Sequence, residues 1–131
     1  MTLENATILL IEEESTLMEI TAFRLELLGY QVIRQETADN AATWLKEQLP
    51  DLVAVGHVAE MESIEFLNHL SNDPRTNELP IVYLSSSTDL EEVQRAFNAG
   101  ADEFLVTPFD PLVLEKKVEG LLAAATNQKD S

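Results

Sequence analysis

The chain of 131 residues contains no cysteine. Disulfide bonds and thiolate chemistry are therefore excluded, and the absence fits a reducing compartment such as the cytosol. No apolar run approaches the roughly 18–20 residues that a membrane helix needs. The first residues also lack the basic segment of a signal peptide. We therefore expect a cytoplasmic protein with no membrane association.

Basic residues are scarce: eight lysines and arginines stand against 24 acidic residues, which gives a net charge of −16. Among the basic residues, only Lys116 and Lys117 are adjacent. Binding to nucleic acids depends on clustered basic residues that displace counterions, so we expect no nucleic-acid partner. The acidic excess is typical of a highly soluble protein. It is also compatible with an acidic face that binds a basic protein partner.

Hydrophobic residues make up 45 % of the chain, and the length suits one domain with one core. Five short apolar runs alternate with helix-length segments. Runs of this length and composition suit strands that are buried on both faces. Strict alternation indicates a parallel sheet with helices on both sides. The runs are residues 7–11, 31–34, 52–55, 81–84 and 103–106.

Start signals place the helices between these runs. Candidate N-caps are Ser15 for the first helix, Thr37 or Asp39 for the second, and Thr88 or Asp89 for the fourth. The third helix covers about residues 63–70, and Pro111 begins the fifth. The fourth and fifth helices each carry an apolar stripe at helical spacing. The stripes are Leu90, Val93 and Phe97, and Leu114, Val118, Leu121 and Leu122.

Residues 8–15, 50–56, 80–86 and 100–109 together resemble, in order and spacing, the receiver domain of bacterial two-component response regulators. The resemblance implies an α/β fold of the flavodoxin-like (βα)5 type. This fold is a three-layer sandwich around a parallel five-stranded sheet in the order 2-1-3-4-5. We expect a receiver-like domain at residues 1–124 and a flexible C-terminal tail at 125–131. In such sheets the functional crevice lies at the carboxyl ends of strands 1 and 3.

The same resemblance indicates a degenerate phosphorylation site. Receivers end the third strand with an aspartate that accepts a phosphoryl group, whereas this chain has Gly56. The matching positions for the acidic pair, the hydroxyl residue and the lysine are Glu12, Glu13, Ser85 and Thr107. Glycine supplies no nucleophile, and threonine supplies no positive charge for a phosphoryl oxygen. We therefore expect no phosphorylation here, no catalytic residue and no enzymatic activity.

Three residues match the positions through which receivers respond to phosphorylation. These switch-like residues are Ser85, Phe104 and Pro108. In the family the proline usually follows a cis peptide bond, which is uncommon for X–Pro bonds in general. The resemblance thus predicts a cis bond between Thr107 and Pro108.

The favoured hypothesis is a pseudo-receiver that binds another signalling protein, or a second copy of itself, without phosphorylation. Family members use the face formed by helix 4, strand 5 and helix 5 for such contacts. A modest interface of mixed charge and scattered apolar residues fits this composition. The candidate contact residues are Leu90, Glu91, Gln94, Arg95, Asn98, Asp102, Glu103, Leu112, Glu115 and Lys116.

An alternative hypothesis is a domain that senses a cation or small ligand in the crevice. Glu12, Glu13 and His57 are weak candidate metal ligands there, because histidine and carboxylates bind transition metals. A single histidine in a loop is more often an ordinary polar residue. We therefore expect no metal and no cofactor.

Overall fold

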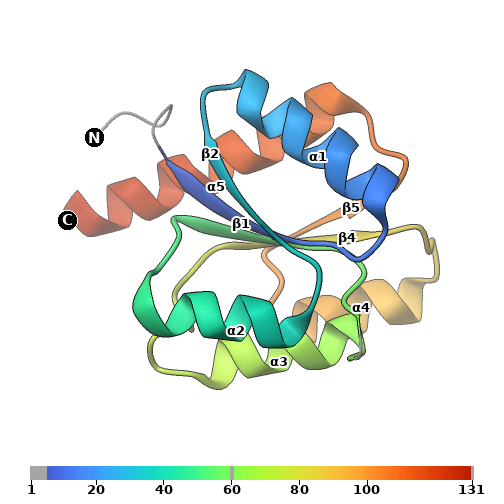
Figure 1. Ribbon diagram of the computed structural model, residues 1–131, viewed down its shortest axis with the longest axis horizontal. Coiled ribbons are helices and arrows are strands. Elements are labelled where there is room, and N and C mark those ends of the chain that lie inside the picture. Colours follow the sequence, from blue (N-terminus) through green and yellow to red (C-terminus); the bar gives the residue numbers. More distant parts are fainter. Residues whose placement is uncertain (1–5, 60, 131) are drawn as a thin grey trace.

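The structure is a computed structural model that describes residues 6–59 and 61–130, with the side chains of 126–130 outside the description. A central sheet is covered by α1 and α5 on one face and by α2, α3 and α4 on the other (Figure 1). The strands are parallel and lie in the order β2-β1-β3-β4-β5. The three-layer fold predicted from the sequence is therefore confirmed.

The five strands lie where apolar runs predict them, and two of them extend one residue further, to Gln35 and Ser85. The bounds are β1 Thr7–Ile11, β2 Gln31–Gln35, β3 Leu52–Val55, β4 Ile81–Ser85 and β5 Glu103–Val106. Strands β3 and β4 are buried along their whole length, as expected for central strands of a covered sheet. Because the two strands are parallel, their carboxyl ends lie at the same edge of the sheet.

The helices are α1 Ser15–Leu27, α2 Ala38–Glu47, α3 Ser63–Asn72, α4 Leu90–Ala99 and α5 Pro111–Asp130. Thr37 caps α2 and Asp89 caps α4, and each is one of the two predicted candidates for its helix. The predicted cap at Ser15 is wrong. The carboxylate of Glu14 accepts the N–H groups of Thr16 at 3.2 Å and Leu17 at 2.7 Å, and Ser15 is the first helical residue.

The expected domain boundary at residue 124 lies inside α5, which continues to Asp130. Alanine, glutamine and lysine in this stretch are good helix formers, so the helix can extend past its last core contact. Of the expected tail, residue 131 lies outside the described residues. The predicted core stripe of α5 is confirmed at Leu114, Val118 and Leu122, which are buried.

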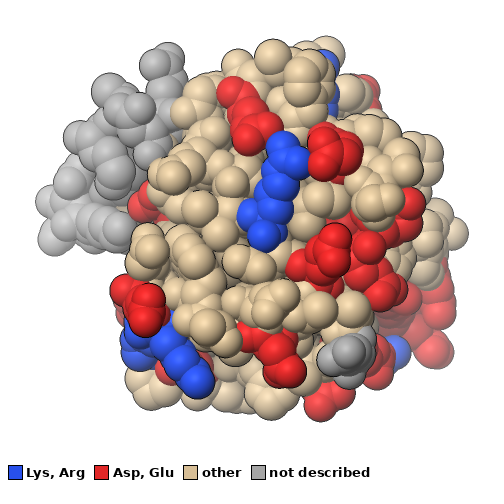
Figure 2. Space-filling view, viewed as in Figure 1, with Lys and Arg blue, Asp and Glu red and all other residues tan. Residues whose placement is uncertain are grey.

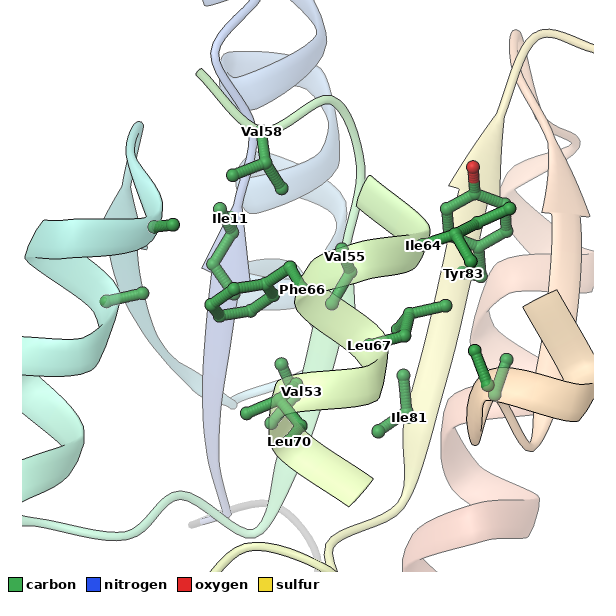
Figure 3. Packing of buried hydrophobic residues seen from close by; sticks show 14 of the residues in the cluster. Ile11, Val53, Val55, Val58, Ile64, Phe66, Leu67, Leu70, Ile81 and Tyr83 are labelled. Carbon is green, nitrogen blue, oxygen red and sulfur yellow. The ribbon is translucent and has the colours of Figure 1, made fainter. Parts of the chain in front are cut away.

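Two hydrophobic clusters fill the spaces between the sheet and its helix layers. One joins the sheet to α2, α3 and α4, with Phe66, Leu67 and Tyr83 among its members (Figure 3). The other joins the sheet to α1 and α5. Helix α4 contributes only Ala96 and Ala99 to the core, while Leu90 and Phe97 of its apolar stripe are exposed.

The peptide bond between Thr107 and Pro108 is cis, which confirms the prediction from the resemblance. Gly100 ends α4 with φ of +122°, a backbone conformation that favours glycine. Across the described part of the chain, none of the helices has the length and apolar character that crossing a membrane requires.

Candidate functional site

The candidate site lies where β1 and β3 end beside each other. Ile11 pairs with Val55 in the parallel register, and Glu12 and Gly56 are the residues that follow. The N–H of Gly56 donates to the carbonyl of Ile11 at 2.8 Å, which fixes the two chain ends together. The sheet topology thus brings the two key positions of the degenerate site into contact.

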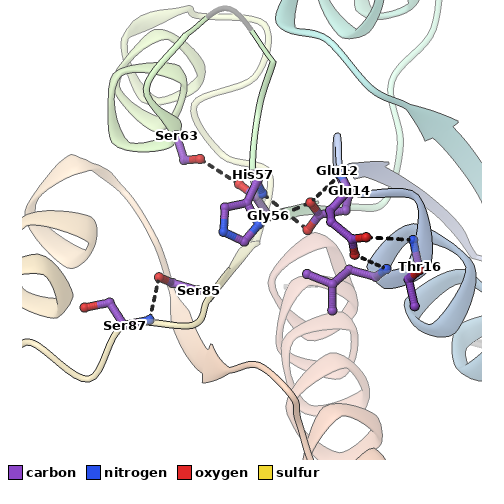
Figure 4. A network of polar contacts seen from close by, with 9 residues as sticks. Glu12, Glu14, Thr16, Gly56, His57, Ser63, Ser85 and Ser87 are labelled. Atoms are coloured by element: carbon purple, nitrogen blue, oxygen red, sulfur yellow. Dashed lines mark hydrogen bonds and ion pairs between the residues drawn. The ribbon is translucent and has the colours of Figure 1, made fainter.

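Glu12 is buried, with only 2 % of its surface exposed. Its Oε1 accepts the backbone N–H of His57 at 3.3 Å, and its Oε2 accepts that of Glu14 at 3.0 Å. The Nδ1 of His57 lies 3.2 Å from Oε2 (Figure 4). A buried carboxylate needs such partners to offset its desolvation. Glu12 is therefore held in one orientation by the loops after β1 and β3.

The absence of a side chain at Gly56 is what makes room for the Glu12 carboxylate. A Cβ added to Gly56 would overlap Glu12 Oε1 and lie 3.0 Å from its Cδ. The end of a glutamate side chain usually yields easily, but this one is buried and tied by its hydrogen bonds. The site thus retains a carboxylate, which the residue after β1 supplies in the space beside the end of β3.

The three weak metal candidates are only partly brought together. Glu12 and His57 are in contact, whereas Glu13 is exposed and joins them through its backbone N–H, which donates to the His57 carbonyl at 2.7 Å. Within residues 6–59 and 61–125, no group of three histidine, cysteine or acidic side chains is arranged to hold a metal. Glu60, an acidic residue of the adjacent loop, lies outside the described residues.

Ser85 ends β4 and is buried at the same edge of the sheet. Its hydroxyl donates to Glu92 Oε2 at 2.6 Å, and Tyr83 O–H lies 3.4 Å from the same oxygen. Burial, followed by the negative charge of Glu92, raises the pKa of Tyr83 to about 12. Sequence reasoning missed Glu92, because an acidic residue in the first turn of a helix is common and marks no site.

Besides Pro108, two predicted site residues belong to β5 and the residue after it: Phe104 is the second residue of the strand, and Thr107 directly follows it. Thr107 is buried, and its N–H donates to the carbonyl of Ser85 at 2.9 Å. In the receiver family that the sequence resembles, a lysine stands at this position, whereas the side chain of Thr107 is uncharged. Phe104 packs against Tyr83 with ring centroids 5.8 Å apart, so the predicted switch position contacts the strand that carries Ser85.

Several of the ten interface candidates form ion pairs or hydrogen bonds within the molecule. Arg95 pairs with Glu62 at 2.8 Å, so it points from α4 toward the start of α3. Glu115 pairs with Arg24 of α1 at 3.4 Å, on the other side of α5. Within the molecule, these two side chains are thus engaged by the start of α3 and by α1, and their place in an interface stays a prediction. The position of Arg95 around α4 directs its side chain toward α3, and the position of Glu115 around α5 directs its side chain toward α1.

Glu103 and Asp102 are also engaged within the molecule. Glu103 pairs with Lys117 at 2.7 Å. Asp102 accepts the N–H of Ile81 at 2.8 Å at the amino end of the sheet, and burial raises its pKa. The remaining candidates are exposed: Leu90, Glu91, Gln94, Asn98, Leu112 and Lys116.

Exposed apolar side chains gather on α4, β5 and the start of α5. Leu90 is 81 % exposed and Leu112 63 %, and Phe97, Val106 and Val113 are exposed to smaller degrees. Sequence reasoning named Leu90 and Leu112 but missed the other three. The sequence predicts Phe97 as part of an apolar helix stripe, but its solvent exposure depends on how α4 is rotated on the sheet.

Acidic side chains outnumber basic ones on the face seen in Figure 2 and gather toward its right-hand side. In the same orientation, the carboxyl ends of the strands lie on that side (Figure 1). Glu13, Glu14, Glu36 and Glu62 are exposed in the segments that surround this edge. The edge that holds the site is therefore electronegative and disfavours the approach of a phosphate.

A family model described as the response regulator receiver domain matches residues 8–119. The phosphate regulon transcriptional regulatory protein PhoB of Escherichia coli K12 is 31 % identical over 116 residues, covering 88 % of this chain and 51 % of that protein. PhoB of Rhizobium meliloti is 31 % identical over 119 residues, covering 90 % of the chain and 52 % of that protein. The chain spans about half the length of the curated relatives it matches.

Solved structures agree with these relatives. A putative response regulator from Chloroflexus aurantiacus has a TM-score of 0.87 and 27 % identity, covering 91 % of this chain and 98 % of that one. The signal receiver domain of a signal transduction histidine kinase from Syntrophus aciditrophicus has a TM-score of 0.83 and 28 % identity, covering 91 % of each chain.

Proposed function

The chain belongs to the response regulator receiver domain family of two-component signal transduction, and from this we propose that it is a pseudo-receiver, which relays signals through protein contacts without accepting a phosphoryl group. The observation that carries the proposal is the arrangement at the end of β3. Gly56 offers no carboxylate there, and the buried side chain of Glu12 fills the adjacent space.

The charges around the site support the same proposal. Phosphoryl transfer needs an in-line nucleophile and cations that absorb charge in the transition state. Here the carboxylate of Glu12 is directed at backbone N–H groups and at His57, and Thr107 carries no charge. An incoming phosphate therefore finds neither a nucleophile at position 56 nor a fixed positive charge from β5. We propose a role without catalysis and without a cofactor.

The proposed output is a contact through the exposed apolar residues of α4, β5 and α5. Leu90, Phe97, Val106 and Leu112 supply exposed apolar area, which suits a modest interface with a signalling protein or a second copy of the chain. The relatives named above include a transcriptional regulatory protein of which this chain covers 51 %. The scarcity of basic residues supports a receiver portion that does not itself bind nucleic acid.

One observation favours the alternative of cation sensing. His57 Nδ1 lies 3.2 Å from Glu12 Oε2, so two candidate ligands are already in contact. Binding of a cation that prefers the folded state would raise the melting temperature. The alternative needs a third ligand, such as Glu13, to turn toward this pair.

Incubation with acetyl phosphate and Mg²⁺, followed by intact-mass measurement, tests the proposal. We expect the mass to stay unchanged, because no carboxylate stands at position 56. A stoichiometric gain of one phosphoryl group would contradict the proposal. Repeating the reaction with His57→Ala would then show whether the histidine had become the acceptor.

A further inference from the structure

The hydroxyl of Ser85 is already engaged by a residue from another element. Ser85 is buried at the end of β4, beside the loop that follows Gly56 (Figure 4). Its hydroxyl donates to Glu92 Oε2 at 2.6 Å, and Glu92 is the third residue of α4. A serine hydroxyl has a single O–H to donate. While it donates to Glu92, it has no proton for a ligand in the crevice.

The same carboxylate oxygen collects a second contact from β4. Tyr83 O–H lies 3.4 Å from Glu92 Oε2, and Tyr83 in turn packs against Phe104 of β5. Hydrogen bonds to a charged acceptor are roughly twice as strong as those between neutral groups. Glu92 thus ties α4 to two residues of β4, one of which contacts the strand of the proposed docking face.

Among the described residues, the amino-terminal half of α4 has few other attachments that could hold it, whereas at the carboxyl end the hydroxyl of Ser71 in α3 donates to the carbonyl of Ala99. Its buried residues are Ala96 and Ala99, whose side chains are single methyl groups and bury little apolar area. The other side-chain tie from the middle of the helix is the ion pair of Arg95 with Glu62, whose side chains are 58 % and 62 % exposed. Exposed ion pairs contribute little to stability. The partly buried hydrogen bond from Ser85 therefore matters more for α4 than it would for a well-packed helix.

We propose that Glu92 is a built-in acceptor for the Ser85 hydroxyl, which holds α4 and the docking face next to it in one position with no phosphoryl group present. The assignment of a docking face rests on the proposed function, whereas the attachment of α4 does not. The regulated step in this chain is then release of the contact between Ser85 and Glu92. Release would free both the hydroxyl and the start of α4.

Hydrogen–deuterium exchange of the α4 amides tests this inference without a partner. Glu92→Ala and Ser85→Ala should each speed exchange in α4 by at least about tenfold, because a hydrogen bond to a charged group commonly shifts an equilibrium by that factor. Glu91→Ala is the matched control, because Glu91 is next to Glu92 in the sequence and its side chain is exposed. The control should exchange like the unmodified protein, and amides of β1 should not change in any variant.

The double variant Ser85→Ala/Glu92→Ala separates a shared contact from two unrelated losses. We expect amide exchange in α4 of the double variant to be no faster than in the faster single variant. Each substitution removes the same hydrogen bond between Ser85 and Glu92, so the second one has nothing more to remove. Unchanged exchange in Glu92→Ala, or an equal effect of Glu91→Ala, would overturn the inference. Acetyl phosphate labelling of the unmodified protein would instead contradict the pseudo-receiver proposal, so the two failures are distinguishable.

Discussion

At the scale of single residues, the site exchanges one carboxylate for another. Gly56 leaves space at the end of β3, and Glu12 reaches into it from β1 with a side chain that is one methylene longer than aspartate. The sequence shows both differences from the receiver pattern, the glycine at position 56 and the glutamate at position 12. It does not predict that they compensate each other, because the overlap depends on the distance between two strands that are far apart in the chain.

The compensation predicts that a methyl group at position 56 is harmful. Gly56→Ala should destabilise the protein by about 1–3 kcal/mol, the usual cost of overpacking, because Glu12 must give up hydrogen bonds to move. Gly120→Ala is the control: its Cβ meets no atom within 4 Å. That change should stabilise α5 by about 0.5–1 kcal/mol. Urea denaturation measures both effects.

The shorter side chain of Glu12→Asp should relieve the overlap. Gly56→Ala should therefore cost less in the Glu12→Asp background than in the unmodified protein. An equal cost in both backgrounds would show that Glu12 does not occupy the space beside Gly56.

Tyr83 predicts how stability responds to alkaline pH. Burial and the charge of Glu92 raise the folded-state pKa of Tyr83 from 10.0 to about 12. Between these values the unfolded chain loses the proton while the folded protein keeps it. The free energy of unfolding should thus fall as pH rises from about 10 toward 12. Tyr83→Phe removes this titration, so its stability should fall less steeply.

Urea denaturation at pH 8 and pH 11 measures the difference. Some loss should persist in Tyr83→Phe, because burial also raises the pKa of Tyr30. An identical loss in the variant and the unmodified protein would contradict the assignment of the raised pKa to Tyr83.

At the scale of elements, strands are predicted better than helix orientations. The strands begin at the residues that apolar runs indicate, because a buried parallel strand is apolar on both faces. The rotation of α4 is not predicted: the stripe of Leu90, Val93 and Phe97 has helical spacing, yet Ala96 and Ala99 face the core. Periodicity shows that a helix has an apolar face, but not that this face is buried.

Exposed phenylalanines on two helices allow a matched test of the docking face. Phe97 of α4 is 44 % exposed and Phe23 of α1 is 57 % exposed. Phe97→Asp should weaken binding to the native partner by at least about tenfold, or roughly 1.4 kcal/mol. Phe23→Asp should bind normally, because α1 lies on the other face of the sheet (Figure 1). Substitutions at exposed positions usually change the free energy of unfolding by less than about 0.5 kcal/mol.

The binding partner is identified by affinity capture from the native cell, and self-association by sedimentation of the purified chain. A partner lost by Phe23→Asp and kept by Phe97→Asp would move the docking surface from α4 to α1. Circular dichroism of both variants confirms that the fold is intact.

At the scale of the whole molecule, charge dominates. A net charge of −16 remains after every basic residue is balanced by an acidic one, and acidic side chains crowd the edge that holds the site (Figure 2). The sequence predicts the excess of acid but not its placement. The placement follows from the topology, because the loops after parallel strands meet at one edge of the sheet.

Like charges repel each other in the folded protein, so salt should stabilise it. Raising NaCl from about 0.01 M to about 1 M shortens the Debye length from about 30 Å to about 3 Å. The melting temperature should therefore rise with NaCl. MgCl2 at equal ionic strength should give a similar rise if the crevice holds no specific cation.

The comparison between these salts also decides between the two proposed functions. A rise with MgCl2 that is several degrees larger than the rise with NaCl would indicate specific binding to the folded state. If Glu13→Gln abolishes the excess while Glu47→Gln preserves it, the cation lies in the crevice and the sensing alternative is favoured. Both side chains are exposed, so neither change should alter the core. Because Gly56 removes one anionic ligand and Glu12 is already satisfied by backbone N–H groups and His57, we expect no excess.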